Sequence, residues 1–153
     1  MKAVVTRVSE ASVVIDGKVN GQIGRGFLVL LGVGPEDTEQ QAIQLAGKVC
    51  KCRVFEDEAG KMNLDLAAVG GELLVISQFT LYADLRSRRP GFSGAAKPDL
   101  AEPLYRRFMA ECEKLGFPPQ HGIFGADMQV ASVNDGPVTL ILDTKQLLET
   151  PRR

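Results

Sequence analysis

One stretch of sequence decides the fold: Gly26-Phe27-Leu28-Val29-Leu30-Leu31-Gly32-Val33. This continuous apolar run is bounded by glycines, which is typical of a strand buried on both faces of a sheet. Residues 73–76 form a second run of the same kind and lead directly into Ser77-Gln78-Phe79-Thr80. We therefore expect two buried strands, the second of which carries polar side chains to its carboxyl end.

Shorter strands are expected elsewhere in the chain. Hydrophobic alternation and turn residues predict strands over residues 3–8, 12–15, 18–23, 53–55, 128–133 and 138–142. Asp16-Gly17 is a strong signal for a hairpin turn between the second and third of these. Asn134-Asp135-Gly136-Pro137 separates the last two, and every residue in it favours a turn.

Two helices are predicted from apolar residues at helical spacing. Thr38 and Gln41 form a capping box before the first helix, and Asp99 with Glu102 predicts the same arrangement for the second. Gly116 is expected to end the second helix. The apolar stripes are Ala42, Ile43, Leu45, Ala46 and Val49 in the first helix, and Leu104, Tyr105, Phe108, Met109, Cys112 and Leu115 in the second.

Length and composition predict one mixed α/β domain over residues 1–144, followed by a polar, loose tail over residues 145–153. The 153 residues are 44% hydrophobic and 24% charged, as in an average globular protein. We find no repeat and no linker. The N-terminus lacks the pattern of a signal peptide, and no apolar run is long enough to cross a bilayer, so we expect a cytoplasmic protein without membrane contact.

The cysteines and the single histidine predict no metal site and no disulfide framework. Cys50, Cys52 and Cys112 are odd in number, and one histidine leaves too few ligands for a Cys/His zinc site. We expect reduced, structural thiols. His121 lies beside Gly122 without a nucleophile pattern, so an exposed loop residue is the simpler interpretation.

Two short segments are candidates for a functional site, although each has an ordinary interpretation. Ser77-Gln78-Phe79-Thr80 either satisfies nearby backbone groups at a strand end, or projects into a pocket with its backbone N–H groups facing a reacting carbonyl. Asn134-Asp135-Gly136-Pro137 is either a hairpin turn or a rigid device that aims its carbonyl oxygens outward, because an X-Pro bond can be cis at modest cost.

Basic residues gather in one loop, although the chain as a whole has a formal net charge of −1. They are Arg86, Arg88 and Arg89, followed by Lys97, Arg106 and Arg107. A solvated surface and a role in phosphate contact are both consistent with this pattern. The balanced overall charge indicates no bulk attraction to nucleic acid, but a local patch can still steer an RNA partner.

Several motifs in a fixed order resemble the bacterial D-aminoacyl-tRNA deacylases, over residues 1 to about 144. The motifs are Arg7-Val8-Ser9-Glu10-Ala11-Ser12-Val13, Gly32-Val33, Phe55-Glu56-Asp57, Gly60-Lys61-Met62-Asn63, Ser77-Gln78-Phe79-Thr80-Leu81, Arg89-Pro90, Phe92-Ser93, Phe124-Gly125-Ala126-Asp127-Met128-Gln129-Val130 and Asn134-Asp135-Gly136-Pro137-Val138-Thr139. Two departures are visible. The segment from Arg86 to Pro90 is one residue shorter than usual and lacks a glycine, and Cys50-Lys51-Cys52 replaces aliphatic residues.

The resemblance implies α/β/β layers with two main helices on one side, and an esterase that removes wrongly joined amino acids from tRNA. It implies a homodimer without cofactor or metal, acting on tRNA and not on DNA, with its site at the subunit interface. Ser77, Gln78, Phe79 and Thr80 would come from one subunit, and a cis Gly136-Pro137 from the other. Arg7 would brace that Gly-Pro segment, and Met128 would line the pocket.

For the chemistry, we expect backbone N–H groups near Phe79 and Thr80 to stabilise an oxyanion while water attacks the ester. Thr80 as nucleophile is the alternative, although no base for it is evident. Gly136-Pro137 would exclude L side chains, so that glycyl-tRNA is also a substrate. The rival functions are an editing deacylase for L-alanyl-tRNA and a non-catalytic RNA-binding module.

Overall fold

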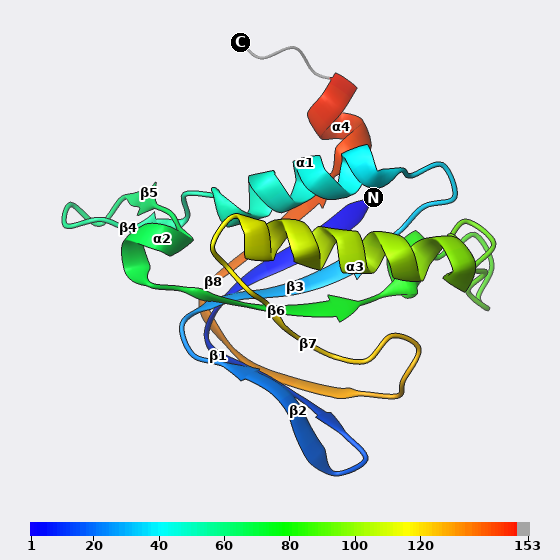
Figure 1. The fold of residues 1–153 in the computed structure, drawn as a ribbon, viewed down its shortest axis with the longest axis horizontal. Coiled ribbons are helices and arrows are strands. Elements are labelled where there is room, and N and C mark those ends of the chain that lie inside the picture. The colour runs from blue at the N-terminus through cyan, green and yellow to red at the C-terminus, as the bar shows by residue number, and fades with distance from the viewer. Residues whose placement is uncertain (150–153) are drawn as a thin grey trace.

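The computed structural model describes residues 1–149, and of residues 148 and 149 the backbone only. One six-stranded sheet has the order β2-β1-β3-β6-β7, with β8 paired along β1. Helices α1 and α3 cover one face of it (Figure 1). The strands are β1 (Lys2–Ile15), β2 (Lys18–Ile23), β3 (Gly26–Gly32), β6 (Glu72–Ser77), β7 (Gln120–His121) and β8 (Gln129–Asp143), with β4 (Phe55–Glu56) and β5 (Met62–Leu64) in a small separate sheet. The helices are α1 (Glu39–Cys50), α2 (Leu66–Val69), the 3₁₀ helix η1 (Phe79–Tyr82), α3 (Pro98–Lys114) and α4 (Thr144–Glu149).

The two apolar runs form the parallel pair β3 and β6 at the centre of the sheet, which confirms both predicted strands. Their register runs from Gly26 opposite Glu72 to Leu31 opposite Ser77. Gly26 has φ +158, and a Cβ there would collide with the backbone of Glu72, so only glycine allows this close approach. Ser77 is thereby placed at the carboxyl end of a buried strand.

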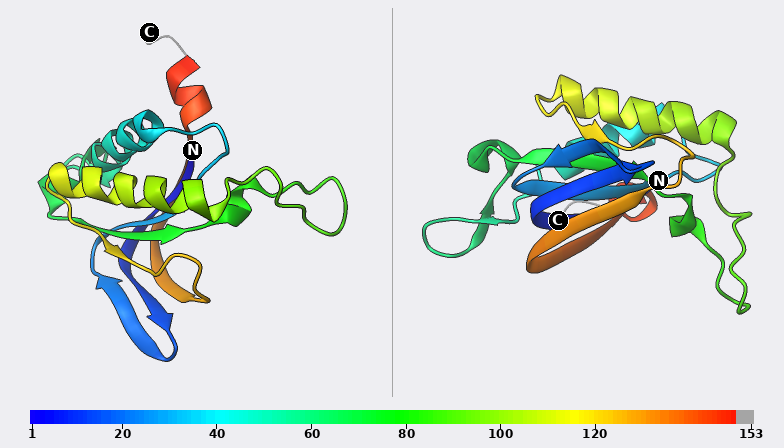
Figure 2. Two further views of the ribbon diagram at one scale, coloured as in Figure 1. Left: turned by 45° about the vertical axis from the view of Figure 1, so that its right-hand side comes forward. Right: turned by 90° about the horizontal axis from the view of Figure 1, so that it is seen from below.

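The sheet folds over itself and produces two β layers. The first half of β1 pairs with β3 and its second half with β2, while β8 runs along the other edge of both halves. Figure 2 shows the β1–β2 hairpin leaving the plane of the central strands. One core lies between the helices and the sheet, and a smaller one lies between the β layers around Val8, Val13 and Ile76. The α/β/β layering expected from the resemblance is confirmed.

Two predicted breaks in the strands are wrong. Residues 3–8 and 12–15 belong to one strand, β1, and residues 128–133 and 138–142 belong to one strand, β8. Pairing with β1 carries β8 through Asn134-Asp135-Gly136-Pro137, where the register shifts instead of reversing. The hairpin turn at Asp16-Gly17 is confirmed, with φ +50 and +76.

The helices follow their predicted stripes except at Ile43, which is exposed, and one helix terminus needs correction. The capping box of α1 is confirmed, since the backbone N–H of Thr38 donates to Oε1 of Gln41 at 2.8 Å. The N-cap of α3 is Lys97 and not Asp99, because Pro98 occupies the first helical position, where no N–H is needed. The three cysteines are free, with Cys50 and Cys112 buried in the core.

The prediction for the segment after Asp143 also needs correction. A loose tail was predicted from Lys145, but Thr144–Glu149 forms helix α4, whose first residue is buried. The remaining residues of that predicted tail, 150–153, lie outside the described residues. Among residues 1–149, no helix has both the length and the apolar character that a membrane span requires.

Candidate active site

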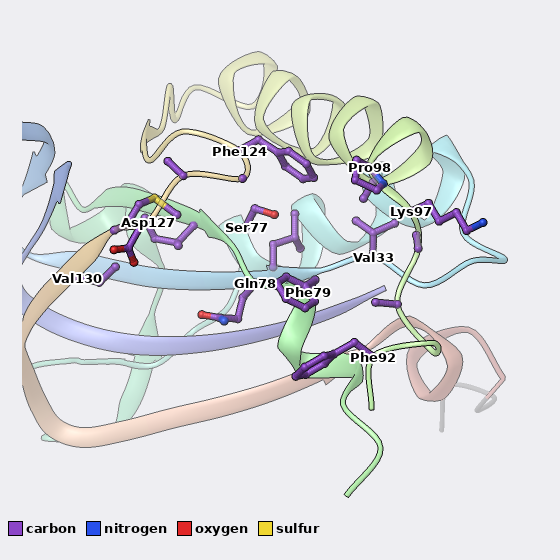
Figure 3. Close-up of a pocket in the computed structure, with 18 residues that line it drawn as sticks. Val33, Ser77, Gln78, Phe79, Phe92, Lys97, Pro98, Phe124, Asp127 and Val130 are labelled. Atoms are coloured by element: carbon purple, nitrogen blue, oxygen red, sulfur yellow. The ribbon is translucent and has the colours of Figure 1, made fainter. Parts of the chain in front are cut away.

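A pocket of about 620 Å³ opens between the end of β6, the N-terminal end of α3 and the start of β8. Ser77, Gln78 and Phe79 line one side of it, and Phe124 lies across from them beneath α3 (Figure 3). Most of its wall is apolar. The other lining residues are Leu31, Val33, Phe92, Ala95, Ala96, Lys97, Pro98, Ala101, Ile76, Gly125, Ala126, Asp127, Met128 and Val130.

The end of β6 is held firmly from both sides. The backbone N–H of Gln78 donates to the carbonyl oxygen of Leu31 on β3 at 2.8 Å. From α3, the hydroxyl of Tyr105 donates to the carbonyl oxygen of Val75 at 3.2 Å. Burial raises the pKa of Tyr105 to about 12, so this hydroxyl keeps its proton at neutral pH. The strand end is therefore a rigid base for the residues that follow.

The chain turns into the 3₁₀ helix η1 directly at the pocket mouth, and this turn frees two backbone donors. The first intrahelical bond runs from the N–H of Leu81 to the carbonyl of Gln78 at 3.3 Å. The N–H groups of Phe79 and Thr80 precede it and have no acceptor among residues 1–149. Two adjacent unpartnered donors at a helix start are suited to a developing oxyanion.

Thr80 is the one residue of the predicted strand-end group that does not line the pocket. It is exposed, and its Oγ1 accepts a hydrogen bond from Nε2 of Gln78 at 2.5 Å. A side-chain amide is a donor here and not a base, so this contact does not activate the hydroxyl for attack.

Met128 lies in the pocket wall, as expected from the resemblance, and neighbouring aromatic rings complete that wall. Phe79 packs edge-on against Phe92, with ring centroids 5.1 Å apart, and Phe124 packs beside Tyr105 at 6.1 Å. Neither Phe92 nor Phe124 was predicted to line the pocket. The sequence around Phe92 and around Phe124 shows no periodicity that would have assigned either residue to the pocket.

Gly136 and Pro137 are outside this pocket. Their peptide bond is cis, as the resemblance implied, and Gly136 has φ +124. Arg7 is buried on β1 and braces this segment: its Nε donates to the carbonyl of Asp135 at 3.1 Å, and its Nη1 to the carbonyl of Val54 at 2.6 Å. Neither the Gly-Pro segment nor Arg7 belongs to the pocket lining of the same chain.

Strand β8, which carries Gly136 and Pro137, is an open edge of the sheet. Within the part of the chain that the structure describes, it pairs with β1 alone, and residues 129–137 are all exposed. Large apolar side chains point into solvent along it, including Val133 and Ile141, which are 51% and 76% exposed. A long edge strand with exposed apolar side chains is a surface that proteins ordinarily cover.

His121 is not among the residues that line the pocket, whereas Asp127 is. His121 is exposed as expected, although it lies in the short strand β7 and not in a loop. No three His, Cys, Asp or Glu side chains within residues 1–149 are grouped as a metal site requires.

An apolar pocket with one free backbone donor in its lining, at Phe79, and a second on the next residue indicates a class of protein suited to bind and cleave an acyl group. Comparison with known proteins narrows this class. The family model described as D-Tyr-tRNA(Tyr) deacylase matches residues 4–143, and the chain belongs to that family. It is 55% identical to the D-aminoacyl-tRNA deacylase of Roseiflexus castenholzii, over 100% of this chain and 98% of the relative. It is 57% identical to that of Lacticaseibacillus casei, over 95% and 99%.

Many solved structures share the fold, among them the following two. A c-Myc DNA unwinding element binding protein is 42% identical, with a TM-score of 0.89 over 94% of this chain and 98% of its own. A probable eukaryotic D-amino acid tRNA deacylase is 14% identical, with a TM-score of 0.82 over 92% and 97%, a likeness that concerns the fold alone.

Proposed function

We propose that this protein hydrolyses the ester bond of D-aminoacyl-tRNA and releases free tRNA and the D-amino acid. The observation that carries this proposal is the unpartnered N–H group of Phe79, which lines an apolar pocket, followed by that of Thr80, in a chain of the deacylase family. The pocket takes the aminoacyl end, and the donors face the ester carbonyl. We expect the cytoplasm as the location, because the substrate is an aminoacyl-tRNA, and no role on DNA.

In the proposed reaction, water adds to the ester carbonyl carbon and the carbonyl oxygen becomes an oxyanion, which the N–H groups of Phe79 and Thr80 stabilise. The bond from carbon to the ribose oxygen then breaks, and that oxygen takes up a proton. The amino acid leaves with the oxygen of water in its carboxylate. This reaction requires positioned hydrogen-bond donors and no side-chain nucleophile.

Replacing Thr80 with valine tests this assignment. Valine keeps the size and the backbone N–H but removes the hydroxyl, so we expect kcat to stay within about fivefold of the wild type. Single-turnover deacylation of D-tyrosyl-tRNA measures it, with Thr80→Ser as the control that retains a hydroxyl. If Thr80→Val binds the substrate normally but does not turn over, Thr80 is the nucleophile instead.

Selection of the D-configuration is assigned to Gly136-Pro137 reaching in from a second subunit. Three observations support this: the segment is exposed, it is absent from the pocket of its own chain, and it lies on an open edge strand with exposed apolar side chains. Its carbonyl oxygens hold the amino group and leave no space for a side chain on the L side. The active form is therefore a homodimer.

The function is tested with four substrates: D-tyrosyl-, L-tyrosyl-, L-alanyl- and glycyl-tRNA. We expect hydrolysis of the D-tyrosyl ester and no hydrolysis of the L-tyrosyl or L-alanyl ester. Glycyl-tRNA should also be cleaved, because Gly136-Pro137 selects by excluding L side chains and glycine has no side chain to exclude. Cleavage of L-alanyl-tRNA in preference to the D-tyrosyl ester would identify the related editing activity, and salt-sensitive binding without any cleavage would identify an RNA-binding module.

A further inference from the structure

A basic hairpin beside the pocket is not used by the chemistry described above. Residues 84–91 form it, and two backbone bonds close it: Asp84 N–H to the carbonyl of Gly91 at 2.7 Å, and Gly91 N–H to the carbonyl of Asp84 at 2.9 Å. The hydroxyl of Ser87 donates to the carbonyl of Arg89 at 2.8 Å across the tip. Figure 2 shows this segment extending well beyond the N-terminal end of α3.

The hairpin is joined directly to the pocket wall. Phe92 follows it, lines the pocket and packs edge-on against Phe79. Lys97 lies farther along the same segment, also at the pocket (Figure 3). A molecule whose end fills the pocket and whose chain leaves through the mouth therefore passes this segment.

Most of the positive charge of the hairpin has no partner among the described residues, 1–149. Asp84 is paired with Arg86, at 2.6 Å between Oδ2 and Nη2, and this guanidinium lowers the pKa of the carboxyl. The side chains of Arg88, Arg89 and Lys97 form no ion pair or hydrogen bond with any residue from 1 to 149. Residues 84–97 thus hold four basic side chains against one acidic one, in a chain with a formal net charge of −1.

We propose that Arg88 and Arg89, with Lys97 at the pocket mouth, bind the phosphodiesters that precede the terminal nucleotide of the substrate RNA. The inference rests on the proposed function, because it takes the esterified nucleotide to be in the pocket. Arginine matches the geometry of phosphate with two parallel donors, and a single-stranded RNA end exposes its phosphates to such contacts. The hairpin contributes to RNA affinity and takes no part in ester cleavage.

The test compares two substrates with the same ester. D-tyrosyl-tRNA carries the phosphodiesters, whereas D-tyrosyl-adenosine has none. For the double variant Arg88→Ala/Arg89→Ala, we expect KM for D-tyrosyl-tRNA to rise about tenfold. The slope of log(kcat/KM) against log[salt] should become shallower by about 1.4, because each phosphate that an arginine neutralises on a single strand contributes roughly 0.7. The values of kcat/KM for D-tyrosyl-adenosine should stay unchanged.

The control is Lys48→Ala/Lys114→Ala, which removes two exposed charges at the opposite end of the helix layer. It should keep the wild-type KM and salt slope. The inference is overturned if the arginine variant leaves KM for D-tyrosyl-tRNA unchanged, or if it weakens cleavage of both substrates equally. If the wild type cleaves neither substrate, the proposed function fails. Binding of tRNA without an attached amino acid, measured over a range of salt concentrations, then tests the role of the hairpin separately. An unchanged tRNA affinity in the arginine variant overturns that role.

Discussion

Replacing Phe79 with proline is expected to lower kcat for D-tyrosyl-tRNA by about 10²- to 10³-fold relative to Phe79→Ala, the usual effect of losing one oxyanion donor. Proline removes the N–H of residue 79, which has no other acceptor in the described chain. The position is the first of the 3₁₀ helix η1, where proline fits. Gln78 before it has φ −141 and ψ 82, outside the helical region that a following proline disfavours.

The alanine variant makes this comparison specific. Both substitutions remove the ring that packs against Phe92, but only proline removes the donor. Pre-steady-state deacylation of the two variants, with circular dichroism to check folding, gives the ratio. Equal rates for Phe79→Pro and Phe79→Ala would show that this N–H group does not stabilise the transition state.

Gly136→Ala is the second substitution with a large expected effect. Gly136 has φ +124, and a Cβ there would lie 2.9 Å from Nη2 of Arg7 and 3.0 Å from the backbone N of Val138. An L residue in this backbone region costs about 1–2 kcal/mol, so the segment must move. If that energy is lost from the transition state, kcat/KM for D-tyrosyl-tRNA falls about 5- to 30-fold.

Gly47→Ala is the matched control for this substitution. Gly47 lies within α1, and an added Cβ would meet nothing within 4 Å. We expect full activity and a free energy of unfolding that rises by about 0.5–1 kcal/mol. Wild-type kinetics for Gly136→Ala on both D- and L-tyrosyl-tRNA would contradict the role of this segment in the site.

The sequence was sufficient to predict most of the fold. Residues 26–33 and 73–76 are short, continuous apolar runs, which are typical of central strands. The helices follow from their stripes. The N-cap of α3 was misplaced because Asp99 and Glu102 imitate a capping box, whereas the helix begins at Pro98, two residues before the predicted start.

The candidate site was only partly predictable from residue chemistry, because each of its segments, taken alone, has the composition of a common strand end or turn. Asn134-Asp135-Gly136-Pro137 has the composition of a turn, and nothing local shows that it continues a strand. Tertiary contacts decide this: β8 stays paired with β1 on both sides of the segment, and Arg7, 128 residues away, donates to the carbonyl of Asp135. Phe92 and Phe124 were missed for the same reason, since the pocket gathers segments that are distant in sequence.

In the proposed dimer, each site is built from the strand end of one subunit and the Gly-Pro segment of the other. Co-expressing Phe79→Pro and Gly136→Ala chains with different affinity tags, and purifying through both tags, isolates the mixed dimer. In that dimer, one site combines both defects and the other combines neither. We predict about half of the wild-type activity on D-tyrosyl-tRNA, well above that of either parent variant. A mixed dimer no more active than the mean of its parents, or the failure of the chains to dimerise at all, would contradict the account.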